Sequence, residues 1–182
     1  VTSENYNHYS FDWMKDSDGF IFSSNYTEDW EYDFRNSELY KIDKNGSNIH
    51  QLTTRNGPDY EPAISPDGKR IAYLGYDDKV QTYQVNNLYL INTDGGDRTK
   101  IDINLDREIS SLRWSSDGKK IFFMYDNEGN TKIAHTTLDG KVTKIIDDVG
   151  GTTIGRPYGG GSYSISKNGK VSYTITSPYH PA

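Results

Sequence analysis

Short apolar segments alternate with polar turns along the whole chain, and the same pair of elements returns about every fifty residues. An apolar strand precedes a turn that contains Asp-Gly or Asn-Gly, and a second apolar strand follows it. The glycines of these turns are Gly19, Gly68, Gly118 and Gly169, which are 49, 50 and 51 residues apart. Such a turn between two apolar runs predicts a β-hairpin, because these residue types tolerate the positive φ of a tight turn.

The hairpin around Gly68 shows the pattern most clearly. Pro66 fixes φ ahead of the bend, and the strand after the turn is apolar from Ile71 to Leu74 without alternation. A strand with one solvent-exposed face would alternate between apolar and polar residues. A short strand that is apolar on both sides is instead expected to lie between packed layers.

A second set of hairpins lies between the first ones. Its turn glycines are Gly46, Gly95 and Gly140, which are 49 and 45 residues apart, and strands precede and follow each of them. Each repeat therefore contains two hairpins, or four antiparallel strands. This period and content predict an all-β protein, a β-propeller of four-stranded antiparallel blades.

The repeats predict about three and a half blades. The complete blades are expected over residues 7–53, 60–103 and 109–147, and the half blade over residues 162–178. Propellers usually close with four to eight blades. The fractional count favours the C-terminal half of a larger propeller, and the alternative is a four-bladed ring that residues 1–6 complete.

An open arc of blades has two faces without a neighbour. One is expected at Phe11 and Trp13 of the first blade. The other is expected on the half blade, at Tyr163, Ile165, Tyr173 and Ile175. Each Å² of apolar surface that stays exposed to water lacks the stabilisation of about 25 cal/mol that burial would provide. We therefore expect the remaining blades of the protein to cover these faces, or the chain to form a homo-oligomer through them.

Composition narrows the classes of function. The net charge is −6 without a basic block, so nucleic acid and anionic membranes are not expected partners. No apolar run approaches the ~20 residues of a membrane helix. The four histidines occupy unrelated positions in the repeat, so neither a metal site nor a cofactor is expected. The absence of cysteine leaves the redox compartment undecided. We expect either the periplasm or the cytoplasm of a bacterium, with the periplasm slightly favoured.

A resemblance to known proteins extends over nearly the whole chain. The segments that carry it include residues 28–31 (EDWE), 51–53 (QLT), 65–73 (SPDGKRIAY), 114–118 (WSSDG) and 177–182 (SPYHPA). On these residues the chain resembles the propeller domain of the prolyl oligopeptidase family of serine peptidases, in its acylaminoacyl-peptidase-like branch. The repeats also resemble those of the Tol-system propeller protein.

The resemblance to the peptidases implies a non-catalytic propeller portion that caps an active site and restricts access to short peptides. The implied partners are a peptide substrate, the remaining blades and a catalytic α/β-hydrolase domain after residue 182. A nucleophile elbow has the form G-x-S-x-G. The nearest string, residues 160–164 (GGSYS), has Ser164 in place of the second glycine, so we expect no catalytic residue in this chain.

Two other functions compete with a peptidase propeller. One is a stand-alone binding propeller that resembles the Tol-system protein. The other is a propeller that is itself an enzyme, such as a polysaccharide lyase. An enzymatic propeller requires a cluster of histidine, arginine or metal ligands at equivalent strand ends, and the sequence does not present one.

The connection at residues 155–161 (GRPYGGG) is the candidate for a substrate-facing surface. Arg156 can bind a carboxylate through two parallel hydrogen bonds. Gly159 and Gly160 let the backbone approach another surface closely, and Tyr158 lies between these residues and Arg156. The alternative is a long connection between blades that glycine keeps flexible.

Overall fold

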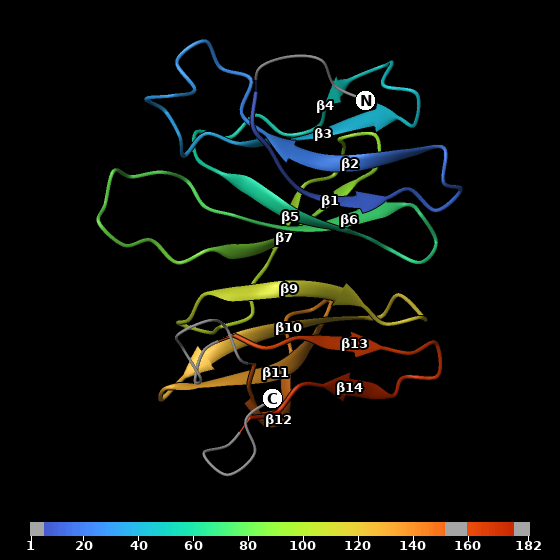
Figure 1. The fold of residues 1–182 in the computed structure, drawn as a ribbon, viewed down its shortest axis with the longest axis vertical. Coiled ribbons are helices and arrows are strands. Elements are labelled where there is room, and N and C mark those ends of the chain that lie inside the picture. The colour runs from blue at the N-terminus through green and yellow to red at the C-terminus, as the bar shows by residue number, and fades with distance from the viewer. Residues whose placement is uncertain (1–5, 152–159, 177–182) are drawn as a thin grey trace. The chain divides into compact units, whose positions relative to one another are not determined.

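The structure is a computed structural model that describes residues 6–151 and 160–176. Every regular element in those two ranges is a β-strand, and every pairing between strands is antiparallel. The chain divides into two units, Val1–Asp102 and Ile103–Ala182 (Figure 1). Each unit is described by itself.

The first unit contains two four-stranded sheets, each built from consecutive strands. The first sheet consists of β1 (His8–Trp13), β2 (Gly19–Ser24), β3 (Glu38–Asp43) and β4 (His50–Gln51). The second consists of β5 (Asp59–Ile64), β6 (Arg70–Gly75), β7 (Asn87–Asn92) and β8 (Thr99–Ile101). Four antiparallel strands in chain order form a propeller blade.

The second unit contains a further sheet of this kind and a shorter one. The four-stranded sheet consists of β9 (Ile109–Trp114), β10 (Lys120–Asn127), β11 (Asn130–Thr137) and β12 (Val142–Val149). The two-stranded sheet consists of β13 (Tyr163–Ile165) and β14 (Val171–Tyr173). The predicted fold class, all-β with four-stranded antiparallel blades, is confirmed.

A repeated hydrogen-bonded turn closes the first hairpin of three sheets. The Gly68 N–H donates to the Ser65 carbonyl (2.8 Å), and the Ser65 hydroxyl donates to the Asp67 carboxylate (2.6 Å). Equivalent bonds recur at Ser115, Asp117 and Gly118 and at Ser166, Asn168 and Gly169. The positive φ falls on the glycine, 75° at Gly68, whereas the aspartate acts through its side chain.

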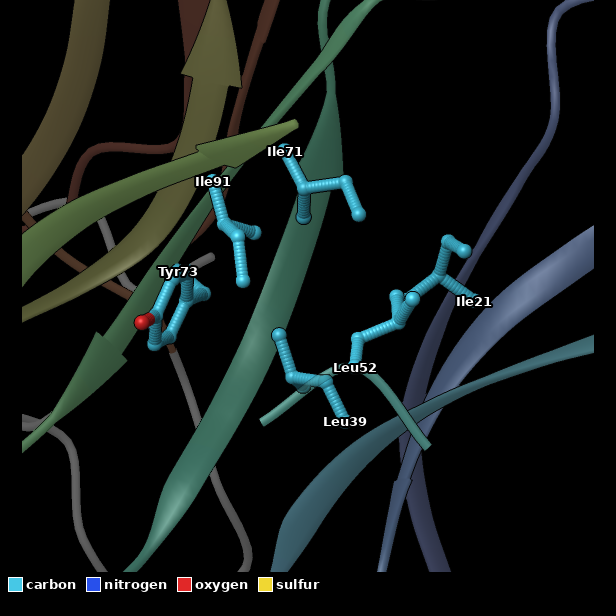
Figure 2. Close-up of a cluster of buried hydrophobic side chains, with 6 residues drawn as sticks. All are labelled: Ile21, Leu39, Leu52, Ile71, Tyr73 and Ile91. Atoms are coloured by element: carbon cyan, nitrogen blue, oxygen red, sulfur yellow. The ribbon is translucent and has the colours of Figure 1, made fainter. Parts of the chain in front are cut away.

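A cluster of buried apolar side chains joins the two sheets of the first unit (Figure 2). Its members are Ile21, Leu39 and Leu52 from the first sheet and its continuation, and Ile71, Tyr73 and Ile91 from the second. The exposed fraction is 0% for every residue from 71 to 74, as the uninterrupted apolar run predicts. This cluster is the hydrophobic core that holds the first blade against the second.

Polar contacts between neighbouring sheets connect residues about one repeat apart. In the first unit the Asp12 carboxylate accepts from the Ile64 N–H (2.7 Å), across 52 positions of the sequence. In the second unit the Ser116 hydroxyl donates to the Lys167 carbonyl (2.7 Å), across 51 positions. Within each unit, the neighbouring sheets are therefore aligned by hydrogen bonds as well as by their shared core.

The half blade turns its apolar side toward the four-stranded sheet of its unit. Tyr163 is 7% exposed and its hydroxyl donates to the Ser111 carbonyl (2.5 Å). Tyr163 belongs to a buried cluster, and Ile165 packs against that cluster. The other members of the cluster are Phe122, Met124, Ile133 and Val149.

The predicted uncovered apolar face of the half blade is therefore wrong for Tyr163 and Ile165. Sequence alternation places these residues on one side of the strand, but it does not say which side a neighbour covers. Tyr173 and Ile175 remain 42% and 58% exposed. On the opposite side of the pair, the hydroxyls of Ser164 and Ser172 lie 2.9 Å apart, so that side is polar.

The first blade carries an aromatic face that no described residue covers fully. Phe11 and Trp13 are 64% and 52% exposed, in agreement with the prediction. They lie opposite Phe22 and Phe20 on β2, and the rings of both Phe11 and Trp13 are in edge contact with the ring of Phe20. Phe22 in turn lies opposite Tyr40 on β3, so one side of the blade carries a continuous row of rings.

Candidate functional site

The predicted substrate-facing connection lies almost wholly outside the described residues. Arg156, Tyr158 and Gly159 fall in the range 152–159, which the structure does not describe. Gly160 is described: its φ is 76°, and a side chain there would meet no atom within 4 Å. The substrate-facing role of this connection stays a prediction.

The inner strands of the complete blades share an irregularity at one repeat position. The register of β1 shifts between His8 and Phe11, that of β5 shifts between Tyr60 and Ala63, and β9 shifts in the same way. Residues with positive φ occur at two of these bulges, Glu61 (54°) and Ser111 (58°). Bulges re-aim side chains, and such strained non-glycine residues cluster at functional sites.

A pocket of about 430 Å³ opens beside two of these bulges, between the first and second blades. Its walls come from β1, from the connection between β2 and β3, and from β5. The lining residues are Tyr9, Ser10, Phe34, Ser37, Tyr60 and Glu61. The Glu61 N–H donates to the Ser10 hydroxyl (2.8 Å), so the two bulges are fastened to each other at the pocket wall.

The two longest connections of the first unit meet close to this pocket. The connection after β2 carries Arg35, whose guanidinium lies 5.4 Å from the centre of the Phe34 ring. The same guanidinium donates to the Gln81 carbonyl (3.4 Å) and lies 3.9 Å from the Asp78 carboxylate, both on the connection after β6. Phe34 therefore belongs to a loop that these contacts hold in place, although its ring is 67% exposed.

A buried ionic group lies at the start of β5. The Arg55 Nε donates to the Asp59 carboxylate (2.8 Å), and its Nη1 donates to Asp77 (3.0 Å) and to the Tyr89 hydroxyl (2.9 Å). Asp59 has an exposed fraction of 0%, and a side chain at Gly75 would meet its Oδ1 at 2.2 Å. These contacts tie the connection before β5 to β5, to β7 and to the connection after β6, while the buried Arg55 Nη2 and Asp59 Oδ2 make no hydrogen bond.

A second carboxyl group, Glu38 at the start of β3, is buried nearby. Burial raises its pKa from the ordinary 4.5 to about 7, and the charge of Asp59 adds to the shift. Burial likewise raises the pKa of Asp59 to about 6, against the opposing effect of Arg55. Glu38 and Arg55 also line a smaller cavity of about 280 Å³ together with Tyr26 and Tyr40.

The described residues contain no group of three or more histidine, cysteine, aspartate or glutamate side chains placed to hold a metal ion. His8 is 3.0 Å from the Ser24 hydroxyl, and burial lowers the pKa of His135. Among the same residues there is no helix long and apolar enough to cross a membrane. The segment at residues 160–164 (GGSYS), which comes nearest to a nucleophile elbow, leads directly into β13. It therefore forms no strand-to-helix turn.

No protein-family model matches the chain. Dipeptidyl-peptidase 5 of Porphyromonas gingivalis is 26% identical over 138 residues, which are 74% of this chain and 20% of that protein. The TolB homolog of Chlorobaculum tepidum is 30% identical over 116 residues, 64% of this chain and 25% of that protein. The chain therefore spans a fifth to a quarter of the length of these relatives.

A solved structure of a putative TolB from Agrobacterium tumefaciens superposes with a TM-score of 0.63 at 25% identity. The match covers 78% of this chain and 47% of that one. This chain is built from β-propeller blades. Its repeats are similar both to a dipeptidyl peptidase and to TolB, as the sequence resemblance indicates.

Sequence reasoning missed the pocket between the first two blades. Tyr9, Phe34 and Tyr60 come from three segments that only the packing of blade on blade brings together. One signal was available, because Glu61 directly precedes Pro62 within the strand. Proline disfavours helical geometry in the residue before it, so an irregular backbone at Glu61 could have been suspected.

Proposed function

We propose that this chain is a non-catalytic propeller portion of a serine peptidase of the prolyl oligopeptidase family. In that role the propeller caps the active site of an α/β-hydrolase domain and admits short peptides. The observation that carries the proposal is the similarity to dipeptidyl-peptidase 5, which extends over 74% of this chain.

The aromatic face of the first blade supports the same proposal. At the equivalent position of the half blade, Tyr163 is buried by the sheet that precedes it in the chain. Phe11 occupies this position in the first blade, and Phe11 and the neighbouring Trp13 on the same side are both more than half exposed. Another blade packed against them would remove this apolar surface from water, which is the expected arrangement inside a larger propeller.

A stand-alone binding propeller is the second candidate function. It is favoured by the 30% identity to the TolB homolog of Chlorobaculum tepidum and by the superposition on a putative TolB. In this case no hydrolase domain accompanies the propeller, and the protein binds its partner without cleaving it.

Peptide hydrolysis by the full-length protein distinguishes the two functions. For the peptidase, we expect turnover of a chromogenic dipeptide substrate, loss of turnover with a serine-directed inhibitor, and no cleavage of a folded protein substrate. Absence of turnover, together with a sequence after residue 182 that lacks G-x-S-x-G, would favour the stand-alone propeller. Equal cleavage of a dipeptide and of a folded protein would contradict the gating role.

The isolated 182-residue chain should hydrolyse neither dipeptide nor acyl-peptide chromogenic substrates, because it contains no nucleophile elbow. The measurement is release of the chromophore at high protein concentration. Turnover that disappears on replacing one serine of this chain would place a catalytic residue here, against the proposal.

A further inference from the structure

The connection between the second and third strands differs in length among the three complete blades. In the second unit, Glu128 and Gly129 alone join β10 to β11. In the first unit, the connection after β2 comprises residues 25–37 and the connection after β6 comprises residues 76–86. Two residues are sufficient to close a β-hairpin, so the blades do not need this extra length in order to fold. Long loops on a rigid scaffold are where binding residues concentrate.

Both long connections expose large apolar side chains. In the connection after β2, Tyr32 is 85% exposed and Phe34 is 67% exposed. In the connection after β6, Val80 is 89% exposed and Tyr83 is 65% exposed. Val80 also has a φ of 55°, a conformation that is rare for a β-branched residue. Apolar side chains that gather in water on neighbouring loops are typical of sites where another protein binds.

Hydrogen bonds hold the two connections in position. The Arg35 guanidinium donates to the Gln81 carbonyl (3.4 Å) and lies 3.9 Å from the Asp78 carboxylate. The connections therefore lie side by side, and in Figure 1 they extend from the same side of the first unit as blue and green loops. Within them, the Asp29 carbonyl accepts from two backbone N–H groups (2.8 Å each), and the Gln84 amide donates to Asp78 (2.7 Å). A surface that is fixed before binding loses less conformational entropy when a partner arrives.

The charge around the exposed rings is negative. Two acids directly precede Tyr32 and Phe34 in the sequence. The two connections contain two basic residues, Arg35 and Lys79, and the first of these already faces Asp78. Four acids of the connection after β2 are exposed and form no ion pair with a described residue, namely Glu28, Asp29, Glu31 and Asp33.

We propose that these two connections form a docking surface for another protein, whose contact face combines apolar and basic side chains. Aromatic anchors supply most of the affinity of such contacts, and complementary charge selects the partner. A symmetric dimer of this chain through the same surface would bring its acids together, so a second copy does not fit. This inference goes beyond the proposed function and does not depend on it, since a peptidase propeller and a stand-alone binding propeller would both present the surface.

The direct test is selection of short random peptides, displayed on phage, with the full-length protein as bait. Peptides that also bind the double variant Phe34→Ser/Tyr83→Ser are removed first, so that the remaining ones require the surface. We expect these peptides to be enriched in arginine, lysine and large apolar residues. Recovery of no peptide that requires the surface, or enrichment of acidic peptides, would overturn the proposal.

A lipid surface is the alternative occupant, because exposed rings also enter the interface of a bilayer. Sedimentation of the full-length protein with phosphatidylcholine vesicles tests this alternative. We expect the protein to remain in the supernatant. Binding to vesicles that is lost in Phe34→Ser would assign the surface to lipid and would overturn the proposal.

Calorimetric titration with the tightest selected peptide then separates the apolar and the charged contributions. Phe34→Ser should weaken binding at least about tenfold, whereas Ile145→Ser, at an exposed apolar residue of β12, should change it less than about twofold. Glu31→Lys should weaken binding severalfold, and more at low salt than at high salt. Glu128→Lys, in the two-residue turn of the third blade, is the matched control and should have little effect. Equal effects of a variant and its control would show that the peptide binds elsewhere, against the proposal.

Discussion

Equivalent positions of the repeat meet opposite surroundings in the first blade and in the half blade. Phe11 and Tyr163 each lie two residues before the end of an inner strand. Phe11 is 64% exposed, whereas Tyr163 is 7% exposed and packs on the sheet that precedes it in the chain. The repeat position determines on which side of the blade an aromatic residue lies, and the preceding blade determines whether it is buried.

The largest expected difference is between alanine variants of these two residues. Tyr163→Ala should destabilise the second unit by about 3 kcal/mol, because it leaves a cavity and removes the hydrogen bond to Ser111. Phe11→Ala should cost less than about 0.5 kcal/mol in the isolated chain, as is usual for an exposed side chain. Urea unfolding of both variants measures the difference. Equal losses would contradict the assignment of covered and uncovered faces.

A buried acid on the aromatic side of the first blade should make stability depend on pH. Glu38 lies two residues from Tyr40 on the same side of β3. Its pKa is about 7 in the folded chain and near 4.5 when unfolded, so the folded state holds a proton that the unfolded state has released. Stability should therefore fall as pH rises from about 4.5 through 7.

The size of this pH effect is at most about 3 kcal/mol, at ~1.4 kcal/mol for each pKa unit. Asp59, with its pKa raised to about 6, should act in the same direction. The measurement is the urea midpoint at pH 5 and pH 8 for the native chain and for Glu38→Gln. A variant that keeps the full pH dependence would show that another group is responsible. The outward side of the half blade, with Ser164 and Ser172, offers no such group.

The smallest expected effect is on self-association of the isolated chain. If the aromatic face of the first blade mediates contact between copies, Trp13→Ser should weaken association about tenfold, or ~1.4 kcal/mol. Ser172→Ala on the polar side of the half blade is the matched control and should leave it unchanged. Sedimentation at several concentrations measures both. A monomeric native chain at all concentrations would remove the homo-oligomer from the expected partners.

The sequence predicts the fold well because the fold is specified locally. Each hairpin depends on a turn whose glycine must accept positive φ, such as Gly68 at 75° or Gly118 at 67°, and whose aspartate accepts two nearby hydrogen bonds. The apolar run at residues 71–74 likewise predicts that these residues are buried, as they are in the structure. These signals lie within a few residues of one another, so they can be recognised without knowing which other segments of the chain pack against them.

The candidate site could not be predicted in the same way. The bulge at Glu61, with its φ of 54°, depends on the hydroxyl of Ser10 from the preceding blade. The buried pairing of Arg55 with Asp59 is spaced by four residues, yet nothing in a non-helical segment reveals that the two side chains meet. The burial of Tyr163 could not be predicted either. Alternation shows which residues share one side of a strand, but it does not show which side a neighbouring sheet covers.

The hydrogen bonds between blades have one further consequence. They join residues 51 or 52 positions apart, as in Ser10–Glu61, Asp12–Ile64, Ser116–Lys167 and Tyr163–Ser111. Because contacts of this kind reach one repeat and no further, a duplicated or deleted segment of one full period would leave every other contact of the same type intact. A protein with this architecture can change its number of blades by unequal recombination in its gene, and partner-binding loops can be exchanged one period at a time.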